Sequence, residues 1–337
     1  MAGAAGGVLA ANVTRAGAFG FIAAGHTPIS HLKAQVGLAR QTLGLGPTEP
    51  LPLGIGLLFW RLESTHGDPS TADEFLQYIV NECQPKAIWL SFGQDLKRWV
   101  EKIIALDDKR LGESGSKQTT ARRLKVLVGV YTTQQAVEVS QWGTVDIIEI
   151  QGTESGGHGP SYQVGLPTIS AVPVLAKAFS NLDRRPLLVA AGGLASGQHL
   201  LTALALGADG AVFGTLFLAT PEALYNDEQK QLVKDSKGED TVRTMAFDHA
   251  RGTLGWGDGV DGRGLRNDTS DEANDVCGSE QGRKRYDDAV KQGDVKRIVT
   301  WSTSVGLVDK IQPAADWVLE IERDAMSTLE RLNSLRC

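Results

Sequence analysis

Short apolar runs alternate with segments of helical period from residue 19 to residue 215. Each run is nearly continuous in apolar residues, which is typical of strands that are covered on both faces. The alternation predicts repeated βα units of a parallel α/β protein. The seven predicted strands are Phe19–Ala24, Leu53–Leu58, Ala87–Ser91, Lys125–Val130, Val145–Ile150, Leu187–Ala190 and Ala211–Phe213.

The segments between these strands carry start and stop signals for helices. Thr71 with Glu74 forms a candidate capping box, and Ser196 precedes an apolar helix that Gly207 would end. Seven strands in βα order favour a closed (β/α)8 TIM barrel over an open sheet. An eighth strand is not found, because residues 2–16 predict a turn and a helix. We therefore expect a TIM barrel in which either the first strand is lacking, its place being before Met1, or the eighth strand is supplied in some other way.

Two regions after residue 225 depart from the βα pattern. Residues 226–300 are polar and glycine-rich, which indicates an excursion or lid, and residues 313–335 have the apolar spacing of a terminal amphipathic helix. We expect residues 1–225 and 301–337 to form the barrel and residues 226–300 to form the excursion.

Charge and cysteine content narrow the class of protein. The chain carries 34 basic and 40 acidic residues, and no run of like charges is long enough to bind a nucleic-acid backbone. Its apolar stretches are too short and too interrupted for a membrane span. Cys83, Cys277 and Cys337 have neither disulfide nor zinc spacing, so we expect a protein of a reducing compartment, the cytoplasm, without a metal site.

Barrel enzymes carry their chemistry on the loops that follow the strands, and three such loops stand out. The first is Q-G-T-E-S-G-G-H-G at 151–159, where glycines would let the backbone approach a flat ligand and hold His158 at the barrel mouth. The other two, at 191–193 and 214–215, are consecutive and glycine-rich, which is typical of a barrel phosphate site. The sequence lacks the motifs that bind nucleoside triphosphates and dinucleotides, so FMN, which carries one phosphate, is the simplest candidate ligand.

Each of these features also has a purely structural interpretation. A single pair of glycines after a strand is usually a turn, and most histidines in loops are structural. His158, however, lies between two glycines with no apolar helix face to occupy. His26 is the other histidine that follows a strand, and Glu154 is a candidate partner for His158. The segment from Trp256 to Asn267 is either a substrate lid or a covered loop.

The sequence resembles the nitronate monooxygenases, formerly called 2-nitropropane dioxygenases, of the fungal type. The most specific matches are E-S-G-G-H-G at 154–159 and A-A-G-G-L-A-S-G at 190–197. They are linked by A-L-G-A-D-G-A-V-F-G-T-L-F-L-A-T-P-E-A at 205–223, and M-A-G at 1–3 and G-R-G-L-R-N at 262–267 add support. These enzymes are FMN-dependent TIM barrels, and the resemblance covers nearly the whole chain.

The resemblance implies a set of site residues and a reaction. His158 falls on the catalytic histidine of the family, which removes the weakly acidic proton next to a nitro group. The implied substrates are a nitronate or nitroalkane and O2, and the products are a carbonyl compound and nitrite. Where many relatives have asparagine after the second strand, this chain has Gly56. The residues implied to contact FMN are Met1, Ala2, Gly3, Gly56, Gln151, Gly156, Gly157, Gly192, Gly193, Val212, Phe213, Gly214 and Thr215.

Two other functions stay open at this stage. An FMN reductase of the same barrel type would use NAD(P)H to reduce a quinone or an enoyl thioester, since one fold hosts several activities. A barrel relic without catalysis would bind phosphate ligands or a partner protein. The sequence sets neither the physiological substrate nor the oligomeric state.

Overall fold

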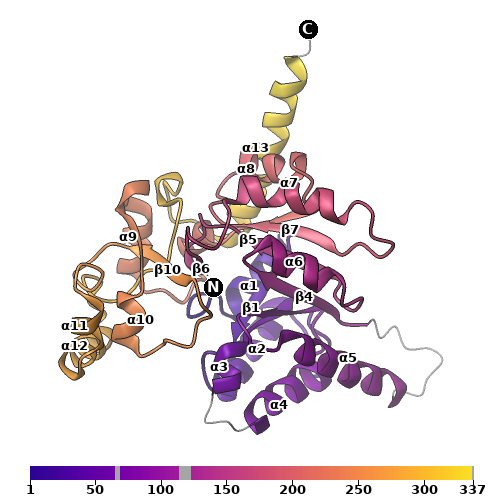
Figure 1. The fold of residues 1–337 in the computed structure, drawn as a ribbon, viewed down its shortest axis with the longest axis horizontal. Helices are drawn as coiled ribbons and strands as arrows, with labels where there is room; N and C mark the ends of the chain where they lie inside the picture. Colours follow the sequence, from indigo (N-terminus) through magenta and orange to yellow (C-terminus); the bar gives the residue numbers. More distant parts are fainter. Residues whose placement is uncertain (65–68, 114–122, 336–337) are drawn as a thin grey trace.

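Seven parallel strands form one curled sheet, in the order β1-β2-β3-β4-β5-β7-β8 (Figure 1). This computed structural model describes residues 1–64, 69–113 and 123–335. All seven predicted strands are confirmed to within two residues at each end. Their bounds are β1 Phe21–Ala24, β2 Gly54–Leu58, β3 Ala87–Ser91, β4 Lys125–Val130, β5 Ile147–Gln151, β7 Leu187–Ala191 and β8 Gly210–Val212.

Helices connect successive strands and cover the outside of the sheet, as the βα pattern predicts (Figure 1). Ser196 caps α8 by accepting a hydrogen bond from the His199 N–H, so this start signal is confirmed. The capping box expected at Thr71 was wrong, because α4 already begins at Pro69 and proline suits a first helical turn. The bounds are α1 Gly7–Arg15, α2 Ile29–Leu43, α3 Phe59–Ser64, α4 Pro69–Gln77, α5 Leu96–Glu113, α6 Thr133–Ser140, α7 Thr168–Phe179 and α8 Gly197–Ala205.

The sheet is a TIM-barrel sheet of seven strands within the described residues. Its strand order begins at β1 and ends at β8, and the described residues supply no strand that pairs with both. The expected TIM-barrel fold class is therefore confirmed, with seven parallel strands among the described residues. The predicted turn and helix near the amino terminus is α1, which packs against α2.

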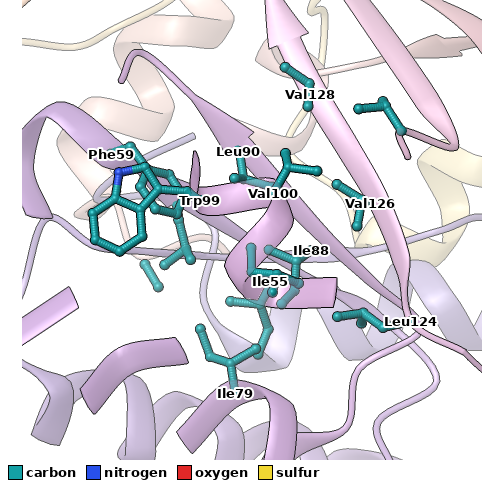
Figure 2. Close-up of a cluster of buried hydrophobic side chains, with 14 of the residues drawn as sticks. Ile55, Phe59, Ile79, Ile88, Leu90, Trp99, Val100, Leu124, Val126 and Val128 are labelled. Atoms are coloured by element: carbon teal, nitrogen blue, oxygen red, sulfur yellow. The ribbon is translucent and has the colours of Figure 1, made fainter. Parts of the chain in front are cut away.

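Apolar side chains fill the space between the sheet and its helices. Figure 2 shows Ile55 of β2, Ile88 of β3 and Val126 of β4 facing Ile79 and Val100 of the helical layer. All five side chains are at most 1% exposed. Burial on both faces explains why the sequence of these strands is nearly continuous in apolar residues.

The polar, glycine-rich residues 226–300 contain regular structure beside the barrel (Figure 1). A small antiparallel sheet has the order β6-β10-β9, and its strand β6 (Gly157–Pro160) belongs to the segment that the sequence predicts to be a loop. The loop prediction was thus wrong for its second half, where pairing with β10 extends the chain. The elements of this region are α9 Asp227–Asp235, β9 Thr241–Thr244, α10 Ala246–Arg251, β10 Val260–Leu265, α11 Asn274–Gly278 and α12 Glu280–Gln292.

The predicted carboxyl-terminal helix is α13 (Ala314–Ser334), which packs along α8 and then projects from the body of the molecule (Figure 1). Gly197 permits this close packing, because a Cβ atom there would lie 2.2 Å from the backbone nitrogen of Ala325. Within the described ranges, no helix has the length and hydropathy to cross a membrane.

Candidate active site

A pocket lies over the carboxyl ends of the parallel strands, where barrel enzymes place their chemistry. Most of the residues implied by the family resemblance line it. Two do not: the Gly3 N–H donates a 2.9 Å hydrogen bond to Nε2 of His26, and Phe213 packs against a neighbouring apolar cluster. The lining includes Met1, Ala2, Gly56, Gln151, Gly156, Gly157, His158, Gly192, Gly193, Val212, Gly214 and Thr215.

His158 occupies one edge of this pocket with its imidazole ring held on three sides. The ring stacks on Trp256, with centroids 3.5 Å apart and planes inclined by 11°, and Trp301 packs at 4.6 Å. Its Nε2 atom lies 2.9 and 3.0 Å from the two carboxylate oxygens of Asp248. The side chain is only 7% exposed, so the ring has one orientation.

Asp248, on α10, is a fully buried carboxylate whose oxygens are held by several donors. Oδ1 accepts hydrogen bonds from the Thr253 hydroxyl at 2.7 Å and from the Trp256 indole N–H at 3.0 Å, in addition to the contact with His158. Burial alone would raise the pKa of Asp248, but the hydrogen bonds from His158 and Thr253 lower it overall. The group is therefore an ionised acceptor at neutral pH.

The same contacts determine the state of His158. Burial lowers the pKa of its imidazole by more than the hydrogen bond to Asp248 raises it. The ring is thus neutral at pH 7 and carries one proton. Because a carboxylate can only accept, that proton lies on Nε2, and the lone pair is on Nδ1. Nδ1 has no hydrogen-bond partner in the part of the chain that the structure describes, so it is free to accept a proton.

Arg243 of β9 forms hydrogen bonds with the backbone of the segment that carries His158. Its guanidinium donates to the carbonyl oxygens of Thr153 at 2.9 Å and Gly159 at 3.0 Å, and it pairs with Asp261 at 2.5 Å. The side chain is 5% exposed. One buried cation therefore holds both ends of the loop around His158.

Glycines at the ends of β7 and β8 line the same pocket as His158. Gly192 and Gly193 have φ values of 109° and 74°, a left-handed conformation that glycine adopts without strain. Gly214 precedes the short 3₁₀ helix Thr215–Leu218, whose first N–H groups have no partners within the helix. These two turns present backbone donors at neighbouring strand ends.

Some polar side-chain atoms of the pocket have no hydrogen-bond partner, and part of its backbone borders empty space. The Ser155 hydroxyl and the Trp89 indole N–H are buried, line the pocket and lack hydrogen-bond partners among the described residues. A Cβ atom added at Gly56 would meet no atom nearer than 3.9 Å, so that backbone faces open space. A flat ligand with polar edges and a phosphate fits this set, and a flavin mononucleotide has that chemistry.

Several features of this site escaped the sequence analysis. Glu154, expected as a candidate partner of His158, instead accepts a hydrogen bond from the Thr168 backbone N–H. His26 does not line the pocket. Asp248 and Arg243 were not singled out, because both lie in the polar region whose fold the pattern does not predict. Trp256 was noted only as part of a lid or covered loop.

A β/α-barrel sheet with a glycine-lined pocket and a buried histidine at its carboxyl end is the arrangement of an α/β-barrel enzyme. A family model described as nitronate monooxygenase matches residues 1–324. The chain is 32% identical over 354 residues to a nitronate monooxygenase of Neurospora crassa, covering 98% of this chain and 88% of that protein. It is 31% identical to the nitronate monooxygenase npaC of Metarhizium robertsii, over 95% of this chain and 88% of that protein. The chain belongs to the nitronate monooxygenase family, whose members depend on flavin.

Solved structures share the fold. FabK from Thermotoga maritima aligns with a TM-score of 0.74 at 23% identity, covering 99% of this chain and 93% of that one. A nitroalkane oxidase from Streptomyces ansochromogenes gives the same TM-score and identity, over 98% and 95% of the two chains. At this level of identity the likeness establishes the TIM-barrel fold. Family membership excludes the non-catalytic relic, so the chain is an enzyme.

Proposed function

We propose that this enzyme uses FMN and O2 to oxidise alkyl nitronates and nitroalkanes to a carbonyl compound and nitrite. The observation that carries the proposal is the neutral, buried imidazole of His158, which Asp248 holds at the edge of a glycine-lined pocket. Two relatives with more than 30% identity are nitronate monooxygenases, and a structural neighbour is a nitroalkane oxidase.

The pocket residues divide between the two ends of FMN. Gly192, Gly193, Gly214 and Thr215 would hold the phosphate through backbone N–H groups and a hydroxyl. Residues at the other end, near Gln151, would contact the ring system, together with the unpartnered hydroxyl of Ser155. FMN, when bound, supplies the electron acceptor for the oxidation and the site of reaction with O2.

His158 acts on the proton of the substrate. For a neutral nitroalkane, Nδ1 accepts a proton from the carbon next to the nitro group, and Asp248 stabilises the imidazolium that forms. Trp256 and Trp301 fix the plane of the ring and exclude water from its faces. A substrate supplied as the nitronate has already lost this proton and does not require the base.

The test begins with the visible absorption spectrum of the purified protein and continues with aerobic turnover of ethylnitronate and nitroethane. We expect a flavin spectrum, FMN released on denaturation, and nitrite from both substrates. His158→Asn should abolish nitrite release from nitroethane and retain it from ethylnitronate. Absence of nitrite from several nitronates, together with rapid anaerobic bleaching of the flavin by NADH, would instead identify an NAD(P)H-dependent reductase.

A further inference from the structure

A carboxyl group lies inside the barrel, on the wall of the pocket that also holds His158. Glu149 belongs to β5, and its side chain lines this pocket although the residue is only 1% exposed. Its Oε1 atom is buried and has no hydrogen-bond partner among the described residues. The proton transfer assigned to His158 makes no use of this group. Because buried polar groups are nearly always paired, the carboxyl group has hydrogen-bonding capacity left for a ligand.

A second unpartnered polar atom lies beside this carboxyl group. The indole N–H of Trp89, on β3, is buried, lines the same pocket and also lacks an acceptor within the described ranges. A Cβ atom added at Gly129 of β4 would lie 2.7 Å from Nε1 of Trp89 and 2.8 Å from Oε2 of Glu149. Gly129 is the register partner of Glu149 in the sheet. The two polar groups therefore converge, because β4 places no side chain between them.

The pocket beside this pair has room for a flat group. Gly56 of β2 is the register partner of Trp89, and a Cβ atom there would meet no atom nearer than 3.9 Å. The glycine turns suited to a phosphate follow other strands, β7 and β8, and line the same pocket. One pocket thus combines a phosphate-type wall with a separate polar pair.

Burial determines the protonation state of Glu149. It raises the pKa of the carboxyl group from 4.5 to about 8, and the positive charge of the Met1 amino group opposes this rise. Burial in turn lowers the pKa of that amino group. The other titratable side chains that line the pocket are His158 and Tyr225, and no lysine or arginine of the described chain lines it. At pH 7 the group is therefore mainly a carboxylic acid, with one O–H donor and one carbonyl acceptor.

We infer that Glu149 and Trp89 recognise the imide edge of the flavin ring, so that Glu149 is a positioning residue for the cofactor. This inference rests on the proposed use of FMN. The imide edge carries an N–H donor between two carbonyl acceptors. A carboxylic acid pairs with the N–H and one carbonyl at the same time, and the indole N–H donates to an acceptor of the same ring. A carboxylate would accept from the N–H but repel the carbonyl oxygens.

The test measures the dissociation constant of FMN for this chain between pH 6 and 9, by quenching of flavin fluorescence. For the parent protein we expect a rise of roughly tenfold between pH 7 and 9, because Glu149 loses its proton. Glu149→Gln should stay within about threefold of the parent value at pH 7 and lose the alkaline rise, since an amide offers a donor and an acceptor without titrating. Glu330→Gln, at an exposed position of α13, should keep the parent profile.

The analogue 3-methyl-FMN tests the same contact from the side of the ligand, because a methyl group replaces the imide hydrogen. The parent protein should bind it at least roughly tenfold more weakly than FMN, since a buried acceptor is left without its donor. In Glu149→Leu, which lacks that acceptor, the two affinities should be similar. If Glu149→Leu does not fold, the pH profile of Glu149→Gln decides the question.

Two results would overturn the inference and leave the proposed oxidation of nitronates intact. One is a parent protein that binds FMN without an alkaline rise that Glu149→Gln removes. The other is a ratio of the two affinities that Glu149→Leu leaves at the parent value. A parent protein that binds no FMN at any pH would overturn the proposed function as well.

Discussion

His158 and Asp248 meet through one ring nitrogen and two carboxylate oxygens, at 2.9 and 3.0 Å, although 90 residues separate them in the chain. The histidine comes from β6 and the aspartate from α10, and the small antiparallel sheet brings the two together. Asp248 thereby fixes both the orientation and the tautomer of the imidazole. In an otherwise apolar setting, this contact keeps Nδ1 available as the base.

Replacing Asp248 by asparagine should therefore impair proton abstraction while sparing steps that need no base. An amide can also present its N–H₂ group to Nε2, which would favour the wrong tautomer. We expect kcat/KM for nitroethane to fall on the order of 10²-fold, the lower range for general-base catalysis. Nitrite release from ethylnitronate should fall much less.

The matched control for this change is Asp275→Asn, which neutralises an exposed aspartate of the same region. It should leave both substrates unaffected. Equal losses on nitroethane and ethylnitronate in Asp248→Asn would show that the aspartate only supports the fold.

The pH dependence of nitroalkane oxidation follows from the lowered pKa of His158. Burial moves this pKa below its ordinary value of 6.5, and only the neutral ring accepts a proton. The kcat/KM for nitroethane should thus rise with pH, reach half its maximum below pH 6.5 and then level off. The profile for ethylnitronate should lack this step. A midpoint above pH 6.5 would mean that Asp248 outweighs burial in the working enzyme.

Removal of the Arg243 guanidinium should destabilise the protein far more than removal of a surface cation. Arg243→Met removes the guanidinium that donates to the carbonyl of Gly159 and to the carboxylate of Asp261. It leaves the carbonyl of Thr153 with only a 3.5 Å hydrogen bond from Arg263. We expect the free energy of unfolding to fall by about 3 kcal/mol, as for other broken buried pairs. Urea denaturation of the variant and the parent protein measures this difference in the free energy of unfolding.

The comparison variant is Arg266→Met, which breaks an exposed pair with Asp271. This substitution should lower the free energy of unfolding by less than about 1 kcal/mol. If both variants lowered the free energy of unfolding by similar amounts, the hydrogen bonds of Arg243 to the His158 segment would have no special role in stability.

The sequence predicts the barrel well because its strands are short apolar runs, of which β4 is buried at all but its first position, and this signal is local. The apolar run at Lys125–Val130, for example, needs no knowledge of distant residues to be recognised as a strand. Glycines at strand ends, such as Gly192 and Gly193, are equally local signals. Both correspond to observed positive φ angles.

The contacts that hold the candidate base are not local, and this is why the sequence does not reveal them. Asp248 is one of many acidic residues in a polar stretch, and only the pairing of β10 with β6 brings its helix to His158. The same pairing turns Gly157–Pro160 into a strand. Glu154 is closer in sequence, but the backbone of Thr168 occupies its carboxylate.

Glu149 is a carboxyl group in the barrel interior that is only 1% exposed. Burial raises its pKa from 4.5 to about 8, against the opposing positive charge of the Met1 amino group. Below pH 4.5 the group is protonated in both the folded and unfolded states. Between pH 4.5 and 8 the unfolded chain loses this proton and the folded chain keeps it. This group alone should therefore lower the free energy of unfolding by up to about 1.4 kcal/mol per pH unit across that window.

Glu149→Gln isolates this contribution, because glutamine resembles the protonated acid in size and does not titrate. The difference in unfolding free energy between the variant and the parent protein should grow as pH rises from 5 to 8 and then stay constant. Glu330→Gln, at an exposed position, should show no such trend. If instead the difference for Glu149→Gln were independent of pH, the carboxyl group would have to be ionised in the folded barrel already at pH 5. It would then need a partner that stabilises the negative charge as well as water does.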